Sequence, residues 1–341
     1  MTTAVKIDNV SIVFGDHPDQ ALPLMDAGEN RAQIQEKTGQ VLGVHNCSID
    51  VKEGEILVLM GLSGSGKSTL LRAINGLNPV VRGAVHVNDG GAMVDVTHAS
   101  DEELRRIRLN RVAMVFQQFG LLPWRSVREN VGLGLELGGM SKADRAAKVD
   151  EQLGLVGLDG WGDRKVGDLS GGMQQRVGLA RAFATEAPIL LMDEPFSALD
   201  PLIRTKLQDE LLDLQTKLKR TIIFVSHDLD EAFKIGNRIA IMEGGRIVQC
   251  GSPQEIYSKP ANDYVAEFVA HMNPLGVLTA GDVMEPAEEA PSVSIPKSAR
   301  VSEVMQLVTD TDGPVGVTVQ GNLVGQVTEK GLLKRLLDPR G

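Results

Sequence analysis

The sequence predicts an α/β protein with a largely parallel β-sheet, helices on the faces of that sheet, and a small α+β module in its last part. Two observations predict this fold. Short apolar runs of strand length alternate with helical patterns, which is typical of a parallel sheet. The composition then changes near residue 275. A stretch at 285–296 is rich in Pro and Glu, which is typical of a linker or loop, and it precedes a compact final segment.

The first predicted strands flank a polar detour. Residues 4–14 are rich in β-branched and aromatic side chains and predict a strand, and strand character resumes at 41–51. Residues 16–40 between them are polar and partly helical, and we expect a surface excursion that binds no substrate. The apolar run at 56–60 predicts a buried strand, and a helix follows from Lys67.

The middle of the chain adds a helical region and two more strands. Residues 126–184 are predicted to be mostly helical, and buried strands are expected at 189–193 and 221–226. A helix with an apolar face separates these two strands. That face consists of Leu207, Leu211, Leu214 and Leu218.

The last segment predicts one helix, two strands joined by a Gly-Asn turn, and a short basic helix. The first helix is marked by Val301, Val304, Met305 and Val308. These elements form a unit of about sixty residues, which is large enough for a separate module. We therefore expect two domains, 1–275 and 276–341.

Composition excludes several classes of protein. The 341 residues carry a net charge of −10, whereas a nucleic-acid-binding surface needs a basic stripe, so no nucleic-acid partner is expected. No apolar run approaches the ~18 residues that span a bilayer, and the start lacks the pattern of a secretory signal. Cys47 and Cys250 form no metal or redox spacing. We therefore expect a soluble, cytoplasmic protein.

A glycine-rich loop follows the strand at 56–60. "GLSGSGKST" fits the pattern G-x-x-x-x-G-K-[ST] in full, and its strand-loop-helix context predicts a phosphate-binding loop. Backbone N–H groups can cradle phosphates, the Lys67 ammonium can reach β- and γ-oxygens, and the Ser68 hydroxyl can ligate Mg²⁺. The candidate nucleotide-binding residues here are Gly61, Ser63, Gly64, Ser65, Gly66, Lys67, Ser68 and Thr69.

Three polar residues follow the other two buried strands. Asp193 ends a strand beside the phosphate loop and can hold the magnesium shell, and Glu194 can act as general base on a water in line with the γ-phosphate. Taken alone, this pair also fits a strand terminus or a helix cap. His227 lies just past the next strand, where a γ-phosphate contact and a capping or packing role are both open.

A second candidate anion site lies more than a hundred residues after the first. In "LSGGMQQR", residues 169–176, a serine and two glycines open a helix and leave backbone N–H groups free for an anion.

The motifs together explain this second site. "GLSGSGKST", "VFQQ", "LSGGMQQR", "ILLMDEP", "SALD" and "VSHD" occur in the order typical of an ABC transporter nucleotide-binding subunit, which residues 4–270 resemble. The resemblance implies a P-loop NTPase core with a helical subdomain at about 120–185. It also implies a head-to-tail homodimer in which Ser170, Gly171 and Gly172 close over the other subunit's ATP, although Met173 replaces the usual Gln. Asp200 would lie along the dimer seam.

Three further residues receive roles from the resemblance. Gln117 is similar to the glutamine that joins the magnesium shell and senses the γ-phosphate. Phe14 stands where an aromatic ring stacks on adenine, with a buried core position as the alternative. Trp124, in "LLPWRSVREN", is either an exposed anchor for the membrane subunit or a core residue of the helical subdomain.

The detour at 16–40, "MGLSGSGKSTLLRAINGL" and "VFQQFGLLPWRSVRENV" resemble the ATPases of quaternary-amine importers. The resemblance implies an ATP-hydrolysing, Mg²⁺-dependent subunit that works with an integral-membrane permease and a quaternary-amine-binding protein at the inner membrane face. "GGAMVDV" and "AHMNPL" look most like the choline branch, with glycine betaine or proline betaine as the alternative substrate. A soluble, non-transport ABC protein is disfavoured, because there is one phosphate loop and no long heptad run.

The segment from about 282 to 338 resembles a single CBS unit, so pairing of two units would need the other subunit. Gly331 stands where a ribose-holding Asp is usual, and this departure weakens the case for nucleotide binding by this module. Its basic residues can face an anionic membrane surface or, as we favour, form a solvated helix face. They are Lys330, Lys334, Arg335 and Arg340.

Overall fold

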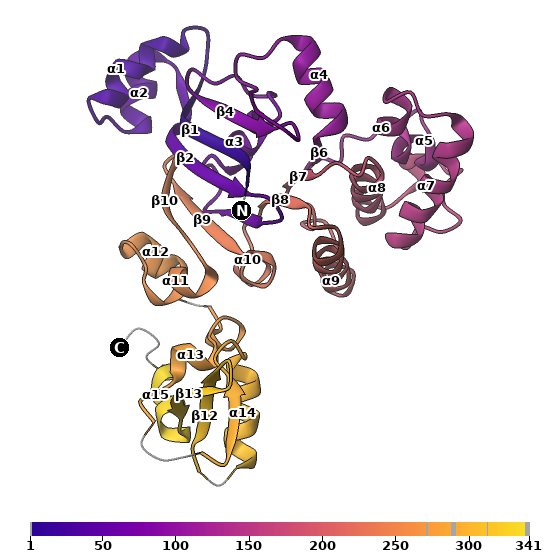
Figure 1. Ribbon diagram of the computed structural model, residues 1–341. Coiled ribbons are helices and arrows are strands. Elements are labelled where there is room, and N and C mark those ends of the chain that lie inside the picture. The colour runs from indigo at the N-terminus through magenta and orange to yellow at the C-terminus, as the bar shows by residue number, and fades with distance from the viewer. Residues whose placement is uncertain (1, 271, 288–290, 312, 338–341) are drawn as a thin grey trace. The chain divides into compact units, whose positions relative to one another are not determined.

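The structure is a computed structural model that describes residues 2–270, 272–287, 291–311 and 313–337 (Figure 1). Its contacts divide the chain into two compact units. Unit 1 comprises Met1–His227 with Ala240–Ile247, and unit 2 comprises Asp228–Ile239 with Val248–Gly341. No helix among the described residues is long and apolar enough to cross a membrane.

A six-stranded sheet has the strand order β10-β9-β3-β8-β7-β6. The four strands β3, β8, β7 and β6 pair in parallel, which confirms the predicted α/β class. All residues of β3, β7 and β8 are buried, as their apolar runs predict, including the polar Asp193 and Thr221 at the strand ends. The bounds are β3 Ile56–Met60, β6 Val112–Val115, β7 Ile189–Asp193, β8 Thr221–Val225, β9 Arg238–Glu243 and β10 Arg246–Gly251.

A second sheet in unit 1 is antiparallel and has the order β2-β1-β4-β5. Helix α3 (Lys67–Ile74) contacts strands of both sheets and buries Leu70, Leu71 and Ile74 completely. The phosphate loop therefore leads into a helix that is fixed between two sheets. The strands are β1 Thr3–Phe14, β2 Val41–Lys52, β4 Arg82–Asn88 and β5 Met93–Asp95.

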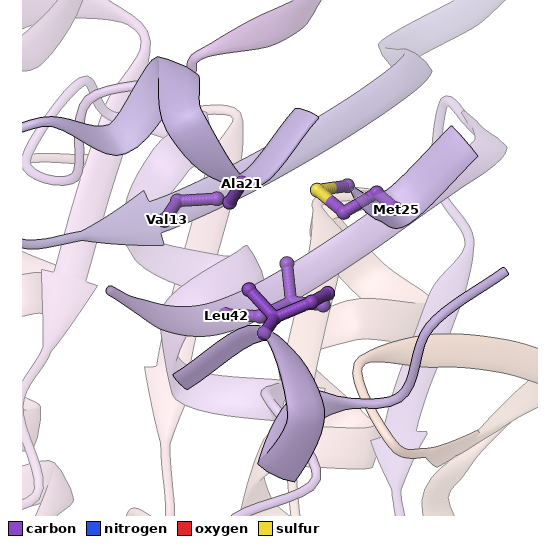
Figure 2. Packing of buried hydrophobic residues seen from close by; sticks show 5 residues of the cluster. Val13, Ala21, Met25 and Leu42 are labelled. Carbon is purple, nitrogen blue, oxygen red and sulfur yellow. The ribbon is translucent and has the colours of Figure 1, made fainter. Parts of the chain in front are cut away.

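The detour at 16–40 has a packed core of its own. It forms η1 (Pro18–Ala21), α1 (Leu22–Asp26) and α2 (Arg31–Thr38), which return the chain from β1 to β2. Figure 2 shows the apolar side chains of this segment meeting those of the two strand ends. This cluster, which we call the insertion core, consists of Val13, Ala21, Met25, Ile34 and Leu42.

The predicted helical region contains four helices in which α8 is central, since α5, α6 and α7 all contact it (Figure 1). Helix α9 buries Leu207 and Leu211, but Leu218 is 51% exposed, so the predicted apolar face ends before the last turn. Lys219 then ends the helix in a left-handed conformation, which turns the chain away. The helices are α4 Asp101–Asn110, α5 Val127–Val131, α6 Leu133–Leu137, α7 Lys142–Leu155, α8 Gly171–Ala184 and α9 Pro201–Leu218.

Unit 2 ends in a three-stranded sheet, β11-β12-β13, in which β11 and β12 are parallel and β12 and β13 antiparallel. Strand β11 falls inside the stretch expected to be a linker, because Ile295 is buried against the sheet. Residues 288–290 of that stretch, and Arg340, lie outside the described residues. The elements are α10 Leu229–Ile235, α11 Pro253–Ser258, α12 Asp263–Phe268, η3 Pro274–Gly276, α13 Ala280–Val283, β11 Val293–Pro296, α14 Val301–Asp310, β12 Val315–Val319, β13 Asn322–Val327 and α15 Glu329–Leu337.

Gly331, at the start of α15, lies directly against Glu285. A Cβ at this position would collide with the Glu285 carboxylate, so an Asp would not fit here without a rearrangement.

Candidate functional site

Three parallel strands end at one edge of the six-stranded sheet. Leu59 pairs with Val225, and Val225 pairs with Asp193, so the segments that follow β3, β8 and β7 emerge side by side. These segments carry the phosphate loop, His227 and Glu194. In parallel sheets the carboxyl ends of strands form the ligand crevice.

The phosphate loop depends on glycine at two crowded positions. Gly61 has φ +144°, and a Cβ there would collide with the carbonyl oxygen of Met242. Gly66 has φ +102°, and its Cβ would lie 2.5 Å from the carbonyl oxygen of Gly43. Only glycine fits both the conformation and the space.

The ammonium group of Lys67 lies inside this loop. Its Nζ donates hydrogen bonds to the carbonyl oxygens of Gly61 (2.7 Å) and Leu62 (2.9 Å). Burial lowers the pKa of Lys67, while the nearby carboxylates of Glu194 and Asp193 act in the opposite direction. The charge is thus held at the loop by neutral acceptors that a phosphate can replace.

Asp193 joins the start of α3 to the end of β7. The Ser68 hydroxyl donates to Oδ1 of Asp193 at 2.6 Å, and the Arg72 guanidinium donates to Oδ2 at 2.9 Å. Asp193 is completely buried, so these two donors replace its water. The paired hydroxyl and carboxylate form a hard oxygen donor set of the kind that Mg²⁺ prefers.

Glu194 is the point where the predicted catalytic side chains meet. Its Oε2 accepts a hydrogen bond from Nε2 of Gln117 at 3.2 Å and lies 3.3 Å from Nδ1 of His227. The side chain of His227 is 62% exposed, while that of Glu194 is 17% exposed. Glu194 has φ +49°, a left-handed conformation that is costly for a residue other than glycine.

A residue without a predicted role anchors the backbone of Glu194. Nε2 of Gln175 donates to the carbonyl oxygen of Glu194 at 3.3 Å, and Oε1 of Gln175 accepts from the N–H of Ala198 at 3.2 Å. The hydroxyl of Ser197 also donates to the Glu194 carbonyl at 3.0 Å. Gln175 is buried in α8, on the apolar stripe with Leu179 and Phe183, and a polar residue on that stripe is the signal that could have identified it.

Ser170, Gly171 and Gly172 open helix α8 but do not join the phosphate loop of their own chain. The hydroxyl of Ser170 accepts the N–H of Met173 at 3.4 Å and caps the helix. Ser170 and Gly171 are exposed, so this helix start is open to another molecule. Asp200 is likewise exposed and caps α9 by accepting the N–H of Ile203 at 3.0 Å.

The exposure of two aromatic residues bears on the core positions that the sequence left open for them. Phe14 is 38% exposed, and a Cβ on Gly43 would lie 2.9 Å from its Cε2 and 3.1 Å from Cγ2 of Thr69. Its ring is therefore beside the end of the phosphate loop rather than in the core. Trp124 is 69% exposed, so it is not a core residue of the helical region.

Comparisons with known proteins match the region of the phosphate loop and most of the chain. The family described as "ABC transporter" matches residues 44–197. The chain is 46% identical to the Glycine betaine/proline betaine transport system ATP-binding protein ProV of Escherichia coli, over 100% of this chain and 84% of that protein. It is 45% identical to the Glycine betaine transport ATP-binding protein OpuAA of Bacillus subtilis, over 95% of this chain and 76% of that protein.

Two further similarities extend the comparison. The Trimethylamine N-oxide transport system ATP-binding protein TmoW of Ruegeria pomeroyi is 41% identical, over 98% of this chain and 97% of its own length. The dimeric post-hydrolysis structure of the ATP-binding cassette MJ0796 bound to ADP and Pi has a TM-score of 0.62 at 32% identity, over 73% of this chain and 98% of that one.

Proposed function

Because the chain belongs to the family of ABC transporter ATP-binding proteins, we propose that it is the ATP-hydrolysing subunit of an importer for glycine betaine, proline betaine or a related quaternary amine. The observation that carries the proposal is the meeting of Gln117 and His227 at Oε2 of Glu194. This group lies at the same sheet edge as a complete phosphate loop. It is the arrangement needed to direct a water at a bound γ-phosphate.

The substrate proposal rests on relatives that match nearly the whole chain. These relatives are named as parts of transport systems for glycine betaine, proline betaine or trimethylamine N-oxide. All three compounds have a fully substituted nitrogen. None of these three relatives is named for choline transport. They therefore give no support to the choline branch, and glycine betaine is the better-supported substrate. The insertion at 16–40 is contained in the matched region of the Escherichia coli relative.

ATP binds through the loop and α3. Backbone N–H groups of Gly61–Thr69 take the β- and γ-phosphates, and Lys67 transfers its hydrogen bonds from Gly61 and Leu62 to phosphate oxygens. Phe14 stacks on the adenine ring beside Thr69. Ser68, Gln117 and the shell around Asp193 would hold Mg²⁺, which would supply positive charge to the bound phosphates.

Hydrolysis is an in-line displacement at the γ-phosphorus. Glu194 accepts a proton from water while the water oxygen bonds to phosphorus and the bond to the ADP oxygen breaks. His227 donates to the γ-phosphate oxygens and holds Glu194 from its other side. The left-handed conformation of Glu194 fixes the carboxylate in place before ATP arrives.

Each site is completed by a second copy of the chain. The exposed helix start with Ser170, Gly171 and Gly172 of the partner subunit closes over the γ-phosphate, and Asp200 lies along the seam. Closure of the dimer excludes water and drives a permease between its inward- and outward-facing states.

Outside the ATP site, Trp124 is the anchor we propose for the permease, at the inner face of the membrane, with a quaternary-amine-binding protein completing the importer. The C-terminal segment 276–341 is a CBS-like regulatory module. A chain that ends at residue 275 is expected to hydrolyse ATP but to lose regulation by salt.

The test is uptake of labelled glycine betaine and labelled choline in cells that lack the gene, complemented with the wild type or with Glu194→Gln. A matched control is Glu186→Gln, since Glu186 pairs with Lys148 on the surface of the helical region. We expect glycine betaine uptake with the wild type and the control, and none with Glu194→Gln.

Purified Glu194→Gln is also expected to form an ATP-bound dimer in size-exclusion chromatography. Choline uptake without glycine betaine uptake would overturn the substrate proposal. Normal uptake with Glu194→Gln would overturn the mechanism.

A further inference from the structure

We propose that Arg31, at the start of helix α2 in the insertion, is a positioning residue that holds the phosphate loop in the shape that binds ATP. The inference rests on the proposed function. It assigns a role to a segment that has no place in the hydrolysis mechanism itself.

The guanidinium of Arg31 bridges two segments that are distant in sequence. Its Nη1 donates to the carbonyl oxygen of Gly64 at 2.6 Å, and its Nη2 donates to the carbonyl oxygen of Gly43 at the start of β2. A Cβ on Gly66 would lie 3.5 Å from Nη2 of Arg31. The guanidinium therefore packs against the phosphate loop on the side of the Gly64 carbonyl, where Gly66 has no side chain to displace it.

The contact from Arg31 fixes one loop peptide, and a contact from Gly245 fixes the next one. The carbonyl of Gly64 bonds to Arg31, while the N–H of the same peptide, from Ser65, bonds to the carbonyl oxygen of Leu62 at 3.1 Å. The next carbonyl, that of Ser65, accepts the N–H of Gly245 at 3.1 Å. In a trans peptide the N–H points away from the carbonyl oxygen, so the N–H of Gly66 is turned toward the opposite side, away from Gly245.

The insertion is built so that Arg31 is fixed in place. Asn30 and Gln33 form a reciprocal capping box that starts α2 at Arg31. Ile34, one turn later, is completely buried in the insertion core. The insertion core thus anchors the helix on β1 and β2, and the helix carries the guanidinium to the loop.

The charge of Arg31 is unusual for its position. A cation at a helix N-terminus is opposed by the helix dipole, so helix stability does not explain the residue. Arg31 is half-buried, burial lowers its pKa, and it forms no ion pair with a carboxylate within the part of the chain that the structure describes. Its Nε atom is buried without a hydrogen-bond partner. A positive charge without a counter-charge therefore lies behind a loop that receives the phosphates.

The experiment measures binding of the fluorescent nucleotide mant-ATP with Mg²⁺ to the full-length protein, together with steady-state ATPase activity. For Arg31→Met we expect the Kd to rise about tenfold, because two hydrogen bonds from a charged group to the loop are lost. The KM for ATP rises in parallel, while kcat at saturating ATP stays within about twofold, since bound ATP restores the loop. Arg31→Lys is expected to recover part of the affinity, because one ammonium cannot reproduce the fork of a guanidinium.

The matched control is Lys37→Met, which removes a cation from the same helix. Lys37 pairs with Glu29 away from the loop, so its removal is expected to leave the Kd unchanged. Equal losses in Lys37→Met and Arg31→Met would overturn the proposal, as would a wild-type Kd in Arg31→Met. A parallel fall in Tm of Arg31→Met that Arg31→Lys does not share, with kcat reduced as much as affinity, would also overturn it in favour of a folding role.

The failure of the proposed function has a different signature. In that case the wild type itself neither binds mant-ATP nor differs from Lys67→Ala, and the proposal for Arg31 falls with it. Wild-type binding with no effect of Arg31→Met leaves the proposed function standing and refutes Arg31 alone.

Discussion

Replacement of Gln175 by Met is expected to disable hydrolysis without touching a phosphate ligand. Gln175 is buried, and its amide holds the carbonyl of Glu194 and the N–H of Ala198. Methionine has a similar length and no hydrogen-bonding amide, so it removes both bonds with little change in packing. What remains on the Glu194 carbonyl is the hydroxyl of Ser197 and its N–H.

The magnitude follows from these contacts. Each lost hydrogen bond contributes about 0.5–1.5 kcal/mol, so the free energy of unfolding is expected to fall by about 1–3 kcal/mol. The left-handed conformation of Glu194 costs about 1 kcal/mol or more and persists only while its surroundings hold it. When the anchor is lost the backbone can relax, the carboxylate moves from Gln117 and His227, and we expect kcat to fall roughly 10- to 100-fold.

The assay is steady-state ATP hydrolysis with a coupled enzyme system, together with mant-ATP binding. We expect a lower kcat and a Kd within about threefold of the wild type, because the phosphate loop is unchanged. Gln174→Met is the matched control, since its neighbouring amide donates to the carbonyl of Leu169 at 3.1 Å and not to Glu194. A kcat within twofold of the wild type for Gln175→Met would refute the reasoning, as would an equal loss in Gln174→Met.

Three further predictions concern the metal, pH and the insertion. Ser68→Ala is expected to raise the Mg²⁺ concentration for half-maximal ATPase activity about tenfold, because a hydroxyl ligand beside Asp193 is lost; a magnesium titration with unchanged half-saturation would contradict this. Burial, with the charges of Arg246 and Arg82, lowers the pKa of His45 to about 4 from 6.5, so the unfolded chain binds more protons between these values. The free energy of unfolding should therefore fall as pH drops from 6.5 to 4, by about 3 kcal/mol in all, and urea unfolding of His45→Gln should show a shallower pH dependence. Ile34→Ala is expected to lower the free energy of unfolding by about 2–5 kcal/mol in urea denaturation, since the side chain is completely buried in the insertion core; a change below 1 kcal/mol would show that the insertion is not packed as described.

Some features follow from the sequence because their causes are local. A run of four or five apolar residues predicts a strand in the interior of a parallel sheet, and β3, β7 and β8 lie where these runs predict them. The phosphate loop is also local, because glycine, lysine and serine at fixed spacing suffice to define it. The meeting of Glu194 and His227 follows once β7 and β8 are neighbours, since Glu194 directly follows β7 and His227 comes two residues after the end of β8.

The tertiary structure decided what depends on contacts between distant segments. In the sequence, Arg31 is one polar residue in a surface excursion. Only folding brings its guanidinium to the carbonyl oxygen of Gly64, 33 positions away. Gln175 reads as part of a polar helix start, and only the packing of α8 against the segment after β7 brings its amide to the Glu194 carbonyl. The Pro- and Glu-rich composition of 285–296 predicts a linker or loop. Only the folded sheet shows that Val293–Pro296 forms strand β11, in which Ile295 is buried.

The sequence by itself therefore determined the α/β class and the order of the chemical groups along the chain. The tertiary structure decided which backbone atoms the side chains of Arg31 and Gln175 bind. The physical reason is that propensity and spacing act over a few residues, whereas a buried amide or guanidinium is placed by the packing of whole elements, as the insertion core does for Arg31.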